Sequence, residues 1–158
     1  EQLHVPSWSD YKKTLQLKQH DVFNKEQETG TQIHELLAEN MHGNMSDILK
    51  NFATDERLSF EQLFTSIQFI FEQKGWNADK WQQLNERPIV FEEQLLIPDK
   101  LLISDDEIIV LDYKTGVKNK KHHQQILTYI AVLGSMYKQP IKGYLLYLKT
   151  MELETVSK

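Results

Sequence analysis

The chain has 158 residues, with 18 basic and 23 acidic side chains and a formal net charge of -5. This length fits one domain with its own core, and a hydrophobic content of 40% excludes an intrinsically disordered chain. The absence of cysteine excludes disulfide scaffolds, thiolate nucleophiles and iron–sulfur clusters. No apolar run in the sequence reaches the length of a membrane span, and we expect a cytoplasmic protein.

The first half of the sequence is predicted to be helical after a polar lead-in. Residues 1–27 are polar and weakly periodic, and we interpret them as a lead-in or linker to a domain that covers residues 28–158. From Thr29 on, apolar residues recur at three- and four-residue steps, which is typical of helices. The expected helices are 29–43, a short one over 47–52, one over 59–74 that ends at Gly75, and one or two helical turns over 78–85.

After Pro88 the apolar pattern changes to that of strands. Residues 107–114 (EIIVLDYK) form the clearest strand, and apolar side chains on both of its faces predict that it is central in its sheet. The other expected elements are a strand over 89–97 that Pro98 interrupts or ends, a strand over 100–103, a helix over 121–137, a strand over 143–149 and its hairpin partner over 152–156. Together these segments predict an α/β domain built mostly on one sheet.

Asp112 and Lys114 are the first candidates for chemistry. Two residues apart on a strand, they point to the same face, at the end where that face stops being apolar. A surface ion pair is the simpler interpretation of such a triplet, which is common by chance. Asp99 favours a site, because a short hairpin joins its strand to that of Asp112 and two neighbouring carboxylates need a cation between them. Alone, Asp99 would be a turn residue after proline.

Polar side chains on two predicted helices could complete such a site. His34 lies on the first helix, where apolar neighbours make a buried spectator histidine the simpler interpretation. Gln125 and Tyr129 are four residues apart on one face of the late helix, and His122 precedes Gln125 by three residues. Alone, these three residues describe only a polar helix edge. Oxygen ligands without sulfur favour magnesium or manganese.

The order of these polar residues along the chain is distinctive. The sequence reads Gly30-x3-His34, then Glu93, Pro98-Asp99-Lys100, DYKTG over 112–116, and His122-x2-Gln125-x3-Tyr129. This constellation resembles the RecB-like nuclease branch of the PD-(D/E)xK superfamily over about residues 29–156. It is most similar to the nuclease domain at the C-terminal end of bacterial helicase–nucleases of the UvrD/AddA type. DYKTG followed by the glutamine–tyrosine helix is the specific part of the likeness.

The resemblance implies a fold and a metal site. The implied fold is a restriction-endonuclease-like core, a mixed β-sheet flanked by helices, with an added N-terminal helical region. The implied ligands of Mg²⁺ or Mn²⁺ are His34, Asp99, Asp112 and the backbone carbonyl of Tyr113. Lys114 would position or activate the attacking water and offset charge on the phosphate.

The resemblance implies further residues with less specific roles. Gln125 and Tyr129 would orient the lysine or the DNA, and Glu93 or Glu92 corresponds to an acidic residue of the family's first strand. The sequence departs from the family around Asp99: Leu96 and Lys100 stand where many members have glycine and arginine.

The implied activity is that of a metal-dependent deoxyribonuclease, an exonuclease in DNA end processing, recombination and repair. The expected partners are DNA, a helicase motor domain in the same polypeptide and a second subunit, in a bacterial cytoplasm. The sequence has no G-x4-G-K-[ST] phosphate loop, so ATP hydrolysis would belong to another domain.

The negative net charge is unevenly distributed. The segment from Tyr113 to Thr150 contains seven lysines and no Asp or Glu, a charge of +7, whereas the rest of the chain has 11 basic and 23 acidic residues, a charge of -12. A lysine-rich segment is often no more than a solvated face. Here, however, several basic residues directly follow Lys114, where a phosphate backbone would lie. The expected DNA-binding residues are Lys118, Lys120, Lys121, His122 and Tyr129.

Two other interpretations remain open from the sequence. The chain could be a catalytically silent nuclease-fold module that binds DNA or docks on a helicase, because a fold does not guarantee an activity. It could also be an α/β domain whose acidic residues are only surface charges. Nuclease and metal-binding measurements distinguish the three.

Overall fold

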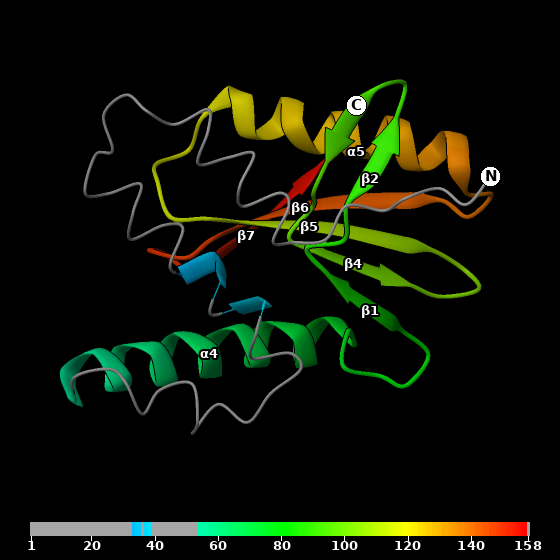
Figure 1. Ribbon diagram of the computed structural model, residues 1–158. Coiled ribbons are helices and arrows are strands. Elements are labelled where there is room, and N and C mark those ends of the chain that lie inside the picture. Colours follow the sequence, from blue (N-terminus) through cyan, green and yellow to red (C-terminus); the bar gives the residue numbers. More distant parts are fainter. Residues whose placement is uncertain (1–32, 36, 39–53, 158) are drawn as a thin grey trace.

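The computed structural model describes residues 33–35, 37–38 and 54–157, and its centre is a mixed β-sheet (Figure 1). Residues 33–35 and 37–38 are helical, as predicted, whereas the remainder of the 29–43 helix, the lead-in over 1–27 and the helix over 47–52 lie outside the described residues. The other elements are α4 (Thr54–Lys74), β1 (Gln82–Asn85), β2 (Ile89–Phe91), β3 (Gln94–Leu96), β4 (Lys100–Ile103), β5 (Ile108–Lys114), α5 (Lys120–Met136), β6 (Ile141–Tyr147) and β7 (Glu152–Val156).

The main sheet has five strands in the order β1-β4-β5-β6-β7. β5 and β6 are parallel, with α5 as the crossover between them, and the other neighbours are antiparallel. The prediction of a central strand is confirmed, because β5 lies in the middle of the sheet and six of its seven residues are buried. The predicted hairpin of the last two strands is confirmed as well.

Each face of the sheet packs against a helix and has its own hydrophobic core. Figure 1 shows α4 on one side of the sheet and α5 on the other. On the α4 side, Ile67 and Phe71 belong to one cluster with Ile109, Leu111 and Tyr113 of β5. On the α5 side, the cluster includes Ile126, Leu133, Val110 and Leu145. Alternate residues of β5 therefore serve opposite cores, and Asp112 and Lys114 share the α5 face with Val110. None of the described helices is long and apolar enough to cross a membrane.

The prediction of helical turns over 78–85 is wrong. Residues 82–85 form β1 instead, paired antiparallel with β4 so that Leu84 lies opposite Leu101. A four-residue segment with a single apolar side chain has little helical or strand preference of its own. Its backbone groups pair with the outer edge of β4, and this tertiary pairing decides its structure.

The prediction of one strand over 89–97 is also wrong, because the segment folds back on itself. β2 and β3 form a separate two-stranded hairpin in which Ile89 pairs with Leu96. Glu92 and Glu93 make its two-residue turn, and both have left-handed φ angles, 46° and 64°. Such turns usually contain Asn and Gly. The sequence lacks that signal, so the reversal cannot be recognised from the pair of glutamates.

Gly143 fixes how closely α5 approaches the sheet. A Cβ atom at this β6 position would lie 2.3 Å from Cγ2 of Ile126 and 2.8 Å from Cδ1 of Ile130, both on α5. Side-chain carbons do not approach that closely, so only glycine permits this distance between helix and strand. The polar residues of α5 are thereby held against the end of β5. At the end of α4, Gly75 has a φ of 69° and ends the helix as predicted.

Candidate active site

Asp99 and Asp112 are hydrogen-bonded to each other, as expected from the predicted hairpin of their strands. β4 and β5 pair antiparallel, with Lys100 opposite Leu111, so Asp99 lies beside the following residues of β5. The backbone N–H of Asp99 donates to Oδ1 of Asp112 at 2.9 Å, and the N–H of Tyr113 donates to Oδ2 of Asp99 at 2.7 Å. The two carboxylates are therefore held next to each other by the backbone of neighbouring strands.

Asp112 is a buried acid in an unfavourable electrostatic position. The residue is only 3% exposed, and burial, followed by the charge of Asp99, raises its carboxyl pKa to about 7. The positive charges of Lys114 and His34 act in the opposite direction. A carboxylate in this position is fully ionised at neutral pH only if more positive charge is brought beside it.

His34 reaches the carboxylates from the N-terminal helical segment. Its Nδ1 lies 2.9 Å from Oδ1 of Asp99, and its ring meets that of Tyr113 edge-on, with the centroids 6.3 Å apart. Burial by itself would lower the pKa of His34, but the hydrogen bond and charge of Asp99, together with the charge of Asp112, raise it. His34 is thus a member of the acidic cluster and not a spectator in the apolar core.

Lys114 extends this cluster onto α5. Its Nζ lies 3.5 Å from Oδ2 of Asp112 and donates to Oε1 of Gln125 at 2.5 Å. The amide of Gln125 donates to the Tyr129 hydroxyl at 3.0 Å, and this hydroxyl donates to the carbonyl of Ile97 at 3.3 Å. Ile97 stands two residues before Asp99, so this chain of hydrogen bonds connects Lys114 back to the segment that carries Asp99.

The donor chemistry of this cluster fits a hard divalent cation. Among the described residues, no three His, Asp or Glu side chains are already arranged to hold a metal ion. The Asp99 carboxylate nevertheless contacts His34, and the Asp99 backbone N–H contacts the Asp112 carboxylate. Added positive charge would offset both the burial and the charge of Asp99, which together raise the pKa of Asp112. Mg²⁺ commonly binds through one or two carboxylates and completes its shell with water and substrate oxygens. The residues present fit that mode of binding.

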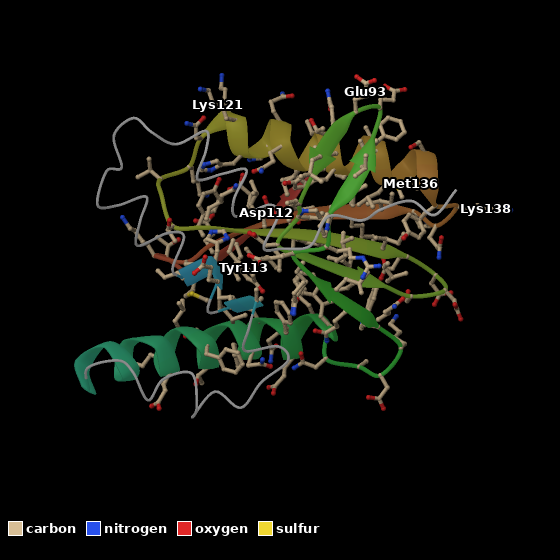
Figure 2. All side chains as sticks on the ribbon, in the orientation of Figure 1. Glu93, Asp112, Tyr113, Lys121, Met136 and Lys138 are labelled. Carbon is tan, nitrogen blue, oxygen red and sulfur yellow. The ribbon has the colours of Figure 1, made fainter. Side chains whose placement is uncertain are left out.

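Four of the five predicted DNA-binding residues lie beside this cluster, around the N-terminus of α5. The fifth, Tyr129, lies more than two turns into the helix and is buried, with its hydroxyl hydrogen-bonded to Gln125 and Ile97. Lys118 precedes the helix, and Lys120 and Lys121 open it with exposed side chains; Figure 2 shows Lys121 at this end of α5. Nδ1 of His122 lies 3.1 Å from the Tyr147 hydroxyl. Burial and then the charge of Lys114 lower the pKa of His122.

The structure does not bring the hairpin glutamates to the site. Glu92 and Glu93 form the exposed turn of the β2–β3 hairpin, and Figure 2 shows Glu93 at its tip, away from Asp112. Glu86 is the acidic residue that the sequence analysis missed. Its backbone N–H donates to the carbonyl of Asp99 at 2.9 Å, it is half-buried, and its φ is 46°. Recognising β1 as the neighbour of β4 would have placed this acid opposite Asp99.

A scan of the chain against protein-family models gives no match, and a search of the curated proteins gives none either.

Proposed function

We propose that this chain is a metal-dependent deoxyribonuclease domain of the RecB-like PD-(D/E)xK type, with a restriction-endonuclease-like core. One observation carries the proposal: hydrogen bonds and an ion pair link two carboxylates, a histidine and a lysine in one continuous cluster at the end of the central strand. An ordinary surface pair of Asp112 and Lys114 would not place a buried acid beside a second acid. The order of the residues along the chain supports the same family.

The ligands of Mg²⁺ or Mn²⁺ would be His34, Asp99, Asp112 and the backbone carbonyl of Tyr113. When bound, such an ion lowers the pKa of a coordinated water and stabilises negative charge on a phosphoryl oxygen. Asp112 contributes its charge from a buried position, where an interaction with a cation is screened less than at the surface. The Tyr113 amide fixes the orientation of Asp99, so this carboxylate is positioned before any ligand arrives.

Lys114 is the residue that would act on the water and the phosphate. Its ammonium group is held between Gln125 and Asp112 at the rim of the cluster, with the side chain 17% exposed. A cation fixed there stabilises the charge that develops on phosphate oxygens during hydrolysis, with no reorganisation at the moment of reaction. Gln125 would act as a positioning residue, since its own amide is held by Tyr129.

DNA is the proposed substrate because basic residues follow the site directly in sequence and in space. Lys120 and Lys121 lie exposed at the start of α5, next to the helix face that carries Gln125. The acidic total would then require a local, metal-assisted contact with the phosphate backbone. A helicase motor in the same polypeptide, and a second subunit, would supply further affinity and direction. Exonuclease action at DNA ends is the form of cleavage that we propose.

Cleavage of linear and single-stranded DNA with Mg²⁺ or Mn²⁺ tests the activity. We expect the wild-type chain to cut these substrates, EDTA to stop it, and Asp112→Ala and Lys114→Ala to reduce the rate by at least about 100-fold. Asp106→Ala is the matched control, because Asp106 is an exposed acid of the turn at the far end of β5. Cleavage that survives EDTA, or full activity of both site variants, would contradict the assignment.

Calorimetric titration with Mn²⁺ separates the nuclease from a silent nuclease-fold module. Wild-type protein and Asp106→Ala should bind the ion, and Asp112→Asn should not, whether or not DNA is cut. Metal binding with saturable DNA binding and no products would identify a catalytically silent module. No binding of metal by the wild-type chain would leave the acids as ordinary charges and remove the proposed function.

A further inference from the structure

Two glutamates of β7 face the N-terminus of α5. In the β6–β7 register, Glu152 pairs with Tyr147 and Glu154 pairs with Leu145. Directly paired residues of antiparallel strands point to the same face, and Tyr147 and Leu145 belong to the core under α5. The backbone pairing therefore places both carboxylates on the α5 side of the edge strand, next to the segment that holds the proposed DNA-binding lysines.

These carboxylates hold Lys118. Its Nζ lies 2.5 Å from Oε1 of Glu152 and 2.9 Å from Oε2 of Glu154, and it sits 5.6 Å from the centroid of the Tyr147 ring. Glu154 also pairs with Nε2 of His123 on α5. The hydrogen bonds that Lys118 donates to Glu152 and Glu154 raise its pKa, and the two carboxylates compensate its positive charge.

Lys120 and Lys121 differ from Lys118 in this respect. Both are exposed at the first turn of α5, and within the part of the chain that the structure describes neither makes an ion pair. The three lysines are equivalent in sequence, since all follow the proposed catalytic lysine closely. In the folded protein they differ because, among the described residues, carboxylates compensate the charge of Lys118 and not those of Lys120 and Lys121.

We propose that Glu152 and Glu154 pair with Lys118 and thereby prevent it from binding phosphate. DNA at the candidate active site would then contact Lys120 and Lys121 but not Lys118. The inference rests on the proposed function, and it assigns the path of the phosphate backbone to the start of α5. β7 thereby limits the basic surface: a phosphate reaches Lys118 only by displacing two carboxylates. Exposed ion pairs of this kind are weak, so the barrier to phosphate is the repulsion by the two glutamates as well as their hold on the lysine.

The salt dependence of DNA binding tests this division of the lysines. Each lysine that neutralises a phosphate of single-stranded DNA adds about 0.7 to the slope of log K against log salt concentration. The probe is a fluorescent single-stranded oligodeoxynucleotide, and anisotropy is recorded with Ca²⁺ in place of Mg²⁺. We expect Lys120→Met and Lys121→Met each to reduce the slope by about 0.7, and Lys118→Met to leave it unchanged.

The glutamate variants provide the second arm of the experiment. Glu152→Gln/Glu154→Gln should bind the oligonucleotide more tightly and steepen the slope by about 0.7, and adding Lys118→Met to this double variant should reverse the change in slope. Asp105→Asn/Asp106→Asn is the matched control, because it removes the same charge from the exposed turn at the other end of the sheet. In this control background, adding Lys118→Met should leave the salt slope unchanged.

The outcomes separate this inference from the proposed function. A loss of slope in Lys118→Met alone, or a Glu152→Gln/Glu154→Gln protein in which Lys118→Met still has no effect, would overturn the division of the lysines while DNA binding stands. No binding of the oligonucleotide by any variant would overturn the proposed function and this inference with it. Circular dichroism of each variant verifies that the compared proteins share the same fold.

Discussion

Lys100 and Asp112 are two buried charged residues on neighbouring strands, and they face opposite sides of the sheet. Lys100 opens β4 and is 1% exposed, and Asp112 lies near the end of β5 and is 3% exposed. Burial lowers the pKa of Lys100 to about 7 and, as the largest of several causes, raises that of Asp112 to about 7. The same physical effect thus brings an acid and a base toward the same value from opposite directions.

The surroundings of the two residues are different. Nζ of Lys100 donates to Oε1 of Gln83 at 3.2 Å and lies 4.7 Å from the centroid of the Phe71 ring, among the apolar residues under α4. Asn85 pairs with Lys100 in the strand register, and within the described residues its side-chain amide has no hydrogen-bond partner. Asp112, in contrast, meets several charged groups of either sign.

The difference separates a buried charge from a site. A perturbed pKa marks both residues, but only Asp112 has ionisable neighbours from several elements that could act together on a ligand. The pKa of Lys100 is lowered by burial and not by neighbouring charges. We therefore infer that Lys100 affects stability and Asp112 affects function.

Catalysis should distinguish the two residues most strongly. Asp112→Asn should lower the rate of DNA cleavage by at least about 100-fold, because it removes a charge that a metal would require. Lys100→Met should keep the rate within about threefold, because Lys100 faces the opposite side of the sheet and its partner there is Gln83. Initial rates at saturating Mg²⁺ give the comparison. Equal losses in the two variants would break the contrast.

The pH dependence of stability should have opposite signs for the two residues in EDTA. Between pH 3.8 and about 7 the folded chain binds more protons at Asp112 than the unfolded chain, so the free energy of unfolding falls as the pH rises. Between about pH 7 and 10.5 the unfolded chain binds more protons at Lys100, so the free energy of unfolding rises with pH. Each unit of pKa difference corresponds to about 1.4 kcal/mol.

Urea unfolding of the two variants measures these slopes. Asp112→Asn should exceed the wild-type stability near pH 7 by at least about 1 kcal/mol, with the gap closing toward pH 4. Lys100→Met should also exceed it near pH 7, with the gap closing toward pH 10. A gap that stays constant with pH would show that the substitution acts by packing and not by charge.

The close approach of α5 to β6 should affect both stability and activity, because it lies on the face of the sheet that carries Asp112. Gly143→Ala would press a Cβ against Ile126 and Ile130, and we expect a loss of about 1–3 kcal/mol in the free energy of unfolding. It should also lower nuclease activity, because Gln125 moves with the helix. Gly134→Ala, within α5, is the matched control. The nearest described atom to its Cβ would be Cδ1 of Ile141 at 4.0 Å, so the change should be neutral or stabilising by up to about 1 kcal/mol. Equal effects on thermal unfolding would contradict the close contact.

The acids of the β2–β3 turn should affect stability only slightly and activity not at all. Glu92→Asn/Glu93→Gly places residues that tolerate left-handed angles where φ is 46° and 64°, so the free energy of unfolding should rise by up to about 1 kcal/mol per position. The nuclease rate should equal that of the wild type. A large loss of activity would place these acids in the site, against their position at the hairpin tip.

The sequence was informative where a local pattern determines the structure. Alternation in residues 108–114 predicted which side chains of β5 share a face, and the spacing of Gln125 and Tyr129 predicted their common helix face. The pairing of Asp99 with Asp112 followed from a short hairpin, which leaves few alternatives for the register. These features depend on residues close together in the chain, so their positions can be worked out from the pattern.

Features that depend on distant pairing could not be predicted. β1 forms because β4 offers an edge, and Glu86 meets Asp99 for the same reason. The burial of Lys100 runs against the usual exposure of lysine, and its partner Gln83 lies on that unrecognised strand. The pairing of Lys118 with Glu152, which is 34 positions away, requires the register of β6 with β7.

The span of chain between the site residues has a kinetic consequence for folding. The Asp99–Asp112 contact closes a loop of 13 residues, whereas the His34–Asp99 contact closes one of 65. Loop-closure entropy makes the longer closure more costly by about 1.4 kcal/mol, and contacts of high sequence separation generally form late. The acidic pair should therefore assemble early with its hairpin, and the histidine should join last. Repulsion between the two acids is consequently present before the histidine arrives, and an ion that binds them would speed refolding.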